Sequence, residues 1–184
     1  NQIVDGNILF QNYANGAGND INVDGLLMAT GKVTILNEEA DITNKGTILT
    51  KQEVLLHTLN GNITNENIIT SEDSTVILRA DKDDAAAGNS DVGNIHNGLG
   101  DVFKTEADIT AAKGISLQAA GTILNVGDYL VTDVGYITVQ AQGSIANIGD
   151  YTLAKDGNIT VRAGVDVGNT GRYSTYAKHR WIYS

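Results

Sequence analysis

The sequence predicts an all-β protein, a parallel β-helix (solenoid) of about seven coils. Three observations favour this fold. Short phrases return every 21 or 22 residues, apolar and other residues alternate within them, and the composition combines 21 Gly and 41% hydrophobic residues with no Pro. A repeat of about 20 residues without helical periodicity is typical of a solenoid, in which each unit buries its apolar face against its neighbours.

The first repeated phrase has the form Ile-x-Asn. It starts at Ile42, Ile63, Ile95, Ile123 and Ile145, and at Val167 with Val in place of Ile. The successive spacings are 21, 32, 28, 22 and 22 residues, and Ile21 adds a unit in which Val23 replaces the Asn. The repeat is therefore 21–22 residues long and carries two loop insertions, near 81–94 and 98–113.

The second phrase is a short strand. It reads "VTILN" from Val33, "VLLHT" from Val54, "VILRA" from Val76, "ISLQA" from Ile115, "ITVQA" from Ile137 and "ITVRA" from Ile159. Alternation of this kind marks a half-buried strand. We expect Ile137, Val139 and Ala141 to face the core, with Thr138 and Gln140 outside.

Glycine and proline usage agrees with a coil that turns several times. Gly adopts turn conformations at little steric cost, and Pro would remove a ladder donor from a rung. A leucine-rich repeat has a similar length but needs several Leu per unit and usually a helical segment. A β-sandwich would not place matching residues at a fixed interval.

The length of 184 residues fits one domain. The chain opens in strand-like sequence, "NQIVDGNILF", without a start Met. We therefore expect residues 1–184 to be a single β-helix segment and a fragment of a longer repeat protein.

Charge and hydropathy exclude several function classes. The net charge of -10 argues against nucleic acid as a partner, because binding to phosphates relies on clustered Lys and Arg. No apolar run approaches the roughly 18 residues that would predict membrane insertion. The basic cluster Lys178, His179 and Arg180 is interpreted as a solvated tail. The chain contains no Cys, so it has neither disulfides nor thiolate metal sites.

Six asparagines share one position of the repeat: Asn44, Asn65, Asn97, Asn125, Asn147 and Asn169. Residues at one position should stack above one another, and their amides can bond to each other and to turn backbone. We interpret them as a structural Asn ladder, with a ligand-binding role as the alternative.

Three tyrosines also recur at 22-residue intervals: Tyr129, Tyr151 and Tyr173. A stack of exposed rings would suit sugar binding. However, Leu27, Ile48 and Ile69 hold this position in earlier coils, and a position that accepts Leu, Ile and Tyr favours the core or its edge.

The first insertion concentrates acidic residues: Asp81, Asp83, Asp84 and Asp91. The carboxylates of these residues are weak candidates for calcium ligands, although their order does not match an EF-hand. A solvated acidic loop is the simpler interpretation. Calcium is the one cofactor that the sequence suggests. In the second insertion, Phe103 is expected to pack on the flank of the rod.

Catalytic residues are scarce. The three histidines, His57, His96 and His179, fall at unrelated positions of the repeat. Asp128 and Asp150 share a position and could be a carboxylate pair like that of a glycosidase. Because each follows a turn Gly, turn chemistry explains them without catalysis. We expect no enzymatic activity.

The units "GTILNVGDYLVTDVGYITVQAQGSIANIGDY" and "VILRADKDDAAAGNSDVGNIHN" resemble the haemagglutinin-type repeats of large secreted bacterial adhesins, the filamentous haemagglutinin family of the two-partner secretion pathway. The resemblance covers Ile21 to Tyr173. It implies a right-handed coil, export through the outer membrane and a role as stalk or adhesive surface. The Asn-Pro motifs typical of the family's secretion domain are absent, which favours an internal segment or a divergent member.

The expected function is that of a non-enzymatic segment of a secreted bacterial surface adhesin. Its expected partners are a receptor or glycan on a host or bacterial surface, and an outer-membrane transporter during secretion. Two alternatives stay open: a carbohydrate-active β-helix enzyme, similar to polysaccharide lyases or hydrolases, and the stalk of a contact-dependent toxin delivery protein.

Overall fold

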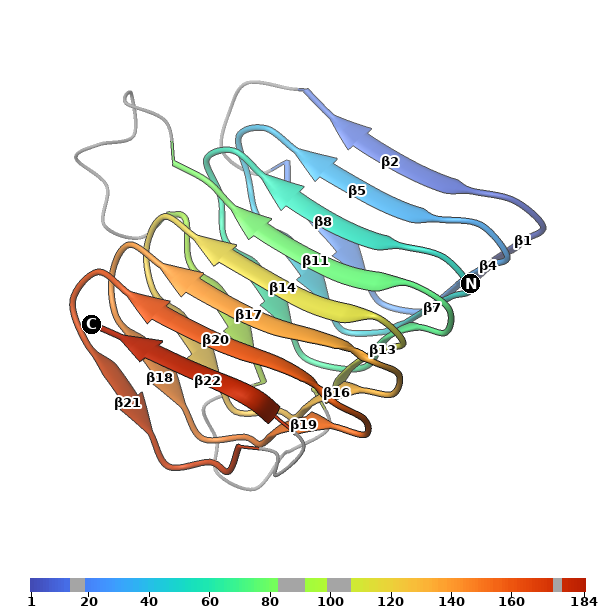
Figure 1. Ribbon diagram of the computed structural model, residues 1–184. Helices are drawn as coiled ribbons and strands as arrows, with labels where there is room; N and C mark the ends of the chain where they lie inside the picture. The colour runs from blue at the N-terminus through green and yellow to red at the C-terminus, as the bar shows by residue number, and fades with distance from the viewer. Residues whose placement is uncertain (14–18, 83–91, 99–106, 174–176) are drawn as a thin grey trace.

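The computed structural model describes residues 1–13, 19–82, 92–98, 107–173 and 177–184. Throughout these ranges the chain forms strands and turns without any helix. The strands build a right-handed parallel β-helix whose coils advance from the N-terminal to the C-terminal end of the stack (Figure 1). The predicted fold class is confirmed.

Three parallel sheets line the coil, and each complete coil gives one strand to each of them. Sheet A contains β1 (Gln2–Val4), β4 (Leu26–Ala29), β7 (Thr47–Thr50), β10 (Ile69–Ser71), β13 (Ile109–Ala111), β16 (Tyr129–Val131) and β19 (Tyr151–Leu153). Sheet B contains β2 (Ile8–Asn12), β5 (Val33–Asn37), β8 (Val54–Thr58), β11 (Thr75–Ala80), β14 (Gly114–Ala119), β17 (Gly135–Ala141), β20 (Gly157–Ala163) and β22 (Ala177–Tyr183). Sheet C contains β3 (Ile21–Val23), β6 (Ile42–Asn44), β9 (Ile63–Asn65), β12 (Ile95–Asn97), β15 (Ile123–Asn125), β18 (Ile145–Asn147) and β21 (Val167–Asn169).

The register of the two repeated phrases is as predicted. The Ile-x-Asn phrase forms sheet C, where Ile123 pairs with Ile145 and Ile145 with Val167. The second phrase forms sheet B, where Ile137 lies between Ile115 and Ile159. Residues that share a position of the repeat therefore lie on successive rungs of the coil.

The core fills the space between the three sheets. In β17 the side chains of Ile137 and Val139 have no exposed surface and Ala141 is buried, whereas Gln140 is exposed and Thr138 is half-buried. From β5 to β20 the first two inward positions of each strand repeat this choice, whereas the third position holds Asn37 and Thr58 in β5 and β8 and Ala from β11 onward. Inward and outward faces follow the predicted alternation.

The two insertions leave the coil at corners. Residues 81–94 join β11 to β12, whereas four residues, 59–62, join β8 to β9. Residues 98–108 join β12 to β13. The segment 109–113 belongs to the regular coil, since Ile109 pairs with both Ile69 and Tyr129. The second insertion is thus shorter at its C-terminal end than expected. Phe103 lies outside the described residues.

Close stacking of turns explains part of the glycine content. A Cβ placed on Gly149 would lie 2.0 Å from the carbonyl oxygen of Gly127 in the preceding coil. Such a contact excludes any side chain unless the backbone moves. Gly127 and Gly149 are therefore required by the approach of successive turns.

The interpretation of residues 178–180 as a tail is wrong. They lie within β22, which pairs in parallel with β20 and adds an eighth strand to sheet B. The repeat phrase is not present in this strand, so its pairing could not be read from the sequence. The side chains of His179 and Arg180 remain exposed.

Candidate functional site

The six asparagines at the end of the sheet C strands form a continuous hydrogen-bonded column. Each side-chain amide donates to Oδ1 of the next: Asn44 to Asn65 at 2.7 Å, Asn65 to Asn97 at 2.7 Å, Asn97 to Asn125 at 2.8 Å, Asn125 to Asn147 at 2.6 Å and Asn147 to Asn169 at 2.6 Å. The first five side chains are buried and Asn169 is exposed. Amides in such a column satisfy each other and have little capacity left for a ligand.

The ends of the column differ from its interior. The residue that pairs with Asn44 in the preceding coil is Val23, which offers no side-chain donor, and Oδ1 of Asn44 has no partner among the described residues. At the other end, Asn169 donates to the carbonyl oxygen of Gly171 at 2.8 Å. The hydrogen bonds of the Asn ladder therefore join the coils to one another and have a structural role.

Tyr129 and Tyr151 are the first residues of β16 and β19 in sheet A, and Tyr173 forms a single bridge with Tyr151 in the next coil. The rings of Tyr129 and Tyr151 are stacked with centroids 5.1 Å apart, and Tyr173 meets Tyr151 edge-on at 5.3 Å. Tyr129 and Tyr151 have no exposed surface. An aromatic strip for sugar rings is therefore wrong for these two residues, because a ligand cannot reach them.

Burial governs the chemistry of the tyrosine hydroxyls. Desolvation raises the pKa of Tyr129 and of Tyr151, and the neighbouring tyrosine adds to each shift. Their hydroxyl oxygens find no hydrogen-bond partner among the described residues. Both groups stay neutral at physiological pH, which agrees with a place in the core.

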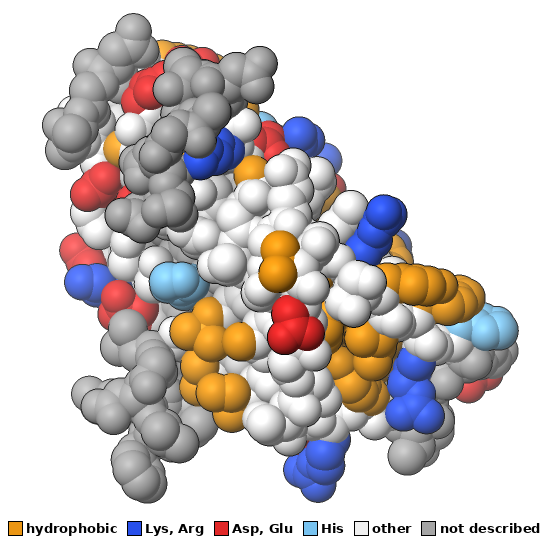
Figure 2. Space-filling view, turned by 90° about the vertical axis from the view of Figure 1, so that its left-hand side faces the viewer, with side chains coloured by type: hydrophobic (Ala, Val, Ile, Leu, Met, Phe, Trp, Pro, Cys, Tyr) orange, Lys and Arg blue, Asp and Glu red, His pale blue; other side chains and the backbone are white. Residues whose placement is uncertain are grey.

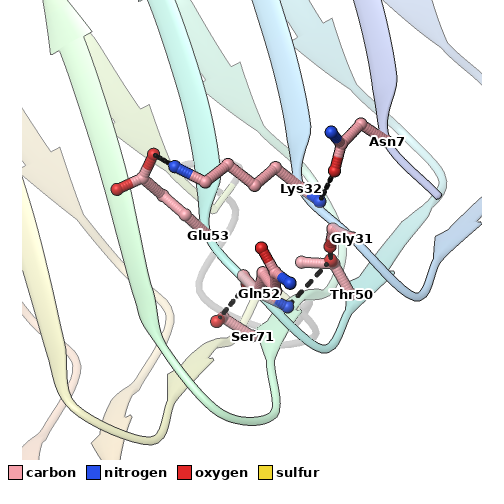
Figure 3. Close-up of polar contacts among 7 residues, drawn as sticks. All are labelled: Asn7, Gly31, Lys32, Thr50, Gln52, Glu53 and Ser71. Carbon is pink, nitrogen blue, oxygen red and sulfur yellow. Dashed lines mark hydrogen bonds and ion pairs between the residues drawn. The ribbon is translucent and has the colours of Figure 1, made fainter.

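Buried hydroxyls close another corner, between sheets A and B (Figure 3). Thr50 donates to the carbonyl oxygen of Gly31, and Ser71 donates to that of Gln52 at 2.5 Å. On the outside of the same corner, Lys32 Nζ lies 3.4 Å from Glu53 Oε1. The inner contacts join each coil to the turn of the preceding coil, so this cluster is structural.

Asp128 and Asp150 lie on successive rungs, as their shared position requires. Asp128 N donates to Asp108 Oδ1 at 3.1 Å, Asp150 N to Asp128 Oδ1 at 2.7 Å, and Arg172 N to Asp150 Oδ1 at 2.7 Å. Each carboxylate therefore accepts a hydrogen bond from the backbone of the next coil. Asp108 is a member that the sequence did not suggest, because the second insertion precedes it.

Electrostatics keep Asp150 ionised. The backbone N–H of Arg172 lowers the pKa of the Asp150 carboxyl, and the Arg172 guanidinium lowers it further through Nε at 3.0 Å. A general acid of a glycosidase needs the opposite shift. Asparagine takes the same backbone-binding role at the corner before sheet C, where Asn62 and Asn94 accept from the next coil. The role thus does not depend on an acid.

Asp81 is the one calcium candidate that the structure describes. Its Oδ2 lies 2.7 Å from Arg79 Nε and 3.0 Å from His57 Nε2. Asp83, Asp84 and Asp91 lie outside the described residues. Within the described ranges no group of three His, Asp or Glu side chains is placed to hold a metal ion.

The outer face of sheet C is mostly uncharged. Its outward column is Asn22, Thr43, Thr64, His96, Leu124, Ala146 and Gly168. Figure 2, which looks onto this side, shows a largely white surface with small hydrophobic groups and few charges. The column places one side chain on each rung, and the chemistry of these side chains changes along the rod.

Sequence reasoning missed the surface at the C-terminal end of sheet B. There Trp181 is 39% exposed and Tyr183 is 53% exposed, and the rings of His179 and Trp181 are stacked with centroids 5.0 Å apart. Only the alternation His-x-Trp-x-Tyr hinted at a strand. The face that these rings occupy depends on pairing that the sequence does not reveal.

Comparisons with family models, with curated proteins and with solved structures found no match for this chain. In the part of the chain that the structure describes, no helix is long and apolar enough to cross a membrane.

Proposed function

We propose that this chain is a non-enzymatic segment of a large secreted bacterial surface adhesin, similar to filamentous haemagglutinin, which acts as a stalk and as an adhesive surface. The observation that carries the proposal is the unbroken Asn ladder, which joins six successive coils through five hydrogen bonds of 2.6–2.8 Å. A stack locked in this way suits a stiff element that holds a binding surface away from the cell.

The outer faces support a displaying role. Parallel strands repeat one side chain per rung at about 4.8 Å, so outward groups form long columns. A column spreads its contacts along the length of the rod, whereas an enzyme gathers its groups in one concave pocket. Sheet C provides such a column, which runs through seven strands.

Charge supports a role in which the rod stands free in solvent. The net charge of -10 opposes edge-to-edge association between copies, because like charges repel. The partners that we propose are a receptor or glycan on a host or bacterial surface, and an outer-membrane transporter during secretion. The proposed location is outside the cell or on the bacterial surface.

Adhesion of coated beads tests this function. Beads that carry the chain are counted on cultured epithelial cells and on bacterial cells, against beads that carry an unrelated protein. We expect severalfold more beads on at least one cell type. The matched control is Ile137→Asn, which buries an unpaired polar group and should unfold the coil, and with it the adhesion. No adhesion by the folded chain to either cell type would contradict the proposal.

A further inference from the structure

A β-bulge sets the orientation of the last strand of sheet B. Gly157 pairs with Ala177, but its neighbour Asn158 pairs with His179, so Lys178 is the extra residue. From there Trp181 lies opposite Thr160 and Tyr183 opposite Arg162. Without the bulge every later side chain of β22 would face the other way. The bulge therefore places His179, Trp181 and Tyr183 on the outer face.

A shallow groove of about 780 Å³ lies on the outer face of sheet B at this end, across β17, β20 and the end of β22. Its outward side chains are Thr138, Gln140, Gln142, Thr160, Arg162 and Tyr183. They comprise two hydroxyls, two amides, one guanidinium and one aromatic ring. Trp181 is outside this lining but pairs across the strands with Thr160, which belongs to it.

Arg162 carries the charged side chain in this lining. No ion pair joins it to a carboxylate among the described residues, whereas Arg79 binds Asp81 at 2.7 Å and Arg172 binds Asp150 at 2.9 Å. Its neighbours in the column on β14 and β17 are Gln118 and Gln140. An exposed guanidinium among neutral amides, in a chain of net charge -10, offers two parallel donors to a carboxylate.

We propose that this groove binds a linear glycan that carries carboxylates on alternate sugars. Arg162 binds one carboxylate, Gln140 and Thr160 bind sugar hydroxyls and amides, and the rings of Tyr183 and Trp181 cover the C–H face of a sugar ring. The inference rests on the proposed adhesive function and names the ligand class and the place where it binds.

The geometry of the coil suits a polymer that crosses the strands. Columns on sheet B repeat at the strand spacing of about 4.8 Å, which is close to the length of one sugar residue in an extended chain. A glycan that runs along the rod therefore meets one side chain of each column at every rung, such as Gln140, Arg162 and Tyr183 in turn. Amides, hydroxyls and aromatic rings supply neutral contacts, and Arg162 adds the single charged one.

The test compares three probes by calorimetry: a hyaluronan hexasaccharide, a neutral hexamer of N-acetylglucosamine and hexaglutamate. The variants are Arg162→Gln, which installs the residue of the preceding rung, and Tyr183→Ala. Lys45→Gln is the matched control, because Lys45 is an exposed cation in the turn between β6 and β7, away from sheet B.

We expect hyaluronan to bind more tightly than the other two probes, and the affinity to fall at least about fivefold in Arg162→Gln and in Tyr183→Ala, with Lys45→Gln unchanged. Equal or tighter binding of hexaglutamate would assign the groove to acidic peptides and overturn the proposal. Equal binding of the neutral hexamer would show that the groove does not recognise a carboxylate on the glycan.

Absence of hyaluronan binding also overturns the proposal. If beads that carry Arg162→Gln still adhere to cells as the parent chain does, the groove is not the adhesive site while the adhesin function stands. If the parent chain fails to adhere to any cell type, the proposed function itself fails, whatever the glycan result.

Discussion

Asn65 Nδ2 lies 2.7 Å from Asn97 Oδ1, although 32 residues separate the two in the sequence. The corresponding bond from Asn44 to Asn65 has the same length across 21 residues. The insertion between β11 and β12 therefore leaves the rungs in contact. Gly93 returns the chain to the regular turn after the insertion. Its N–H donates to the carbonyl oxygen of Gly61 in the preceding coil, and its own carbonyl oxygen accepts from the N–H of Gly121 in the next coil.

Asn97→Ala tests the ladder. The substitution leaves Nδ2 of Asn65 without its acceptor and Oδ1 of Asn125 without its donor, and both are buried. We expect the free energy of unfolding in urea to fall by about 2–6 kcal/mol, since each of the two unsatisfied buried groups costs roughly 1–3 kcal/mol.

Asn169→Ala is the matched control for the ladder. Asn169 is exposed, and Asn147 keeps a bond to the carbonyl oxygen of Gly149 at 2.6 Å when its acceptor is lost. This change should cost under about 1 kcal/mol. Equal costs for the two substitutions would mean that the interior amides contribute nothing special.

Ile137→Ala tests the assignment of faces in sheet B. Ile137 has no exposed surface and packs between Ile115 and Ile159, so the loss of its side chain should destabilise the chain by about 2–5 kcal/mol. Thr138→Ala, one residue further on the outer face, should cost under about 1 kcal/mol. Chemical denaturation of both variants measures the difference in the free energy of unfolding. Similar losses for the two variants would contradict the assignment of an inner and an outer face.

The buried tyrosines predict a loss of stability at alkaline pH. In the unfolded chain a tyrosine ionises near a pKa of about 10, whereas burial holds the pKa values of Tyr129 and Tyr151 higher in the folded chain. The folded state therefore keeps protons that the unfolded state releases, and stability is complete below pH ~10 and falls above it by about 1.4 kcal/mol per pH unit for each group.

Urea unfolding between pH 8 and 11, roughly spanning the unfolded pKa, measures this dependence. Tyr151→Phe should make the decline less steep, because one of the tyrosines with a raised pKa is removed. At neutral pH the same variant should be as stable as the parent or more so, since the Tyr151 hydroxyl has no partner among the described residues. A flat profile above pH ~10 would show that these tyrosines ionise in the folded chain.

Asp128→Asn and Asp150→Asn test the enzyme alternative. Both carboxylates accept backbone hydrogen bonds from the next coil, and an Asn side chain keeps that acceptor, so both variants should fold. We expect no cleavage of acidic or neutral polysaccharides by the parent chain or the variants. Reproducible turnover that disappears in either variant would favour the enzyme over the adhesin.

The sequence predicted two of the three sheets well. Sheets B and C carry phrases that recur with similar residue types, because most inward positions hold Ile, Val or Leu and the strands end in a small or ladder-forming residue, such as Ala141 in sheet B and Asn147 in sheet C. Sheet A could not be recognised as readily, since its strands, such as Ile-Thr-Ser in β10 and Tyr-Leu-Val in β16, share a pattern of burial but no phrase.

The site was less predictable than the fold. Burial of Tyr129 and Tyr151 followed from the aliphatic residues of earlier coils, but the exposed rings of β22 depend on a one-residue bulge at Lys178. Alternation alone leaves the facing of a strand undetermined when its partner is unknown. The contact of Asp81 Oδ2 with His57 Nε2 at 3.0 Å joins side chains of neighbouring rungs, and the sequence analysis did not anticipate it.

The continuity of the coil depends on the stacking of β9 on β12 across the first insertion. The chain has no Cys, so spin labels can be attached at Thr64→Cys and His96→Cys, which pair on the outer face of sheet C. Electron paramagnetic resonance should give strong dipolar broadening at the strand spacing of about 4.8 Å, and much weaker broadening for labels at 64 and 146, three rungs apart or about 14 Å. Equal broadening for the two pairs, or none for 64 with 96, would contradict the continuous coil.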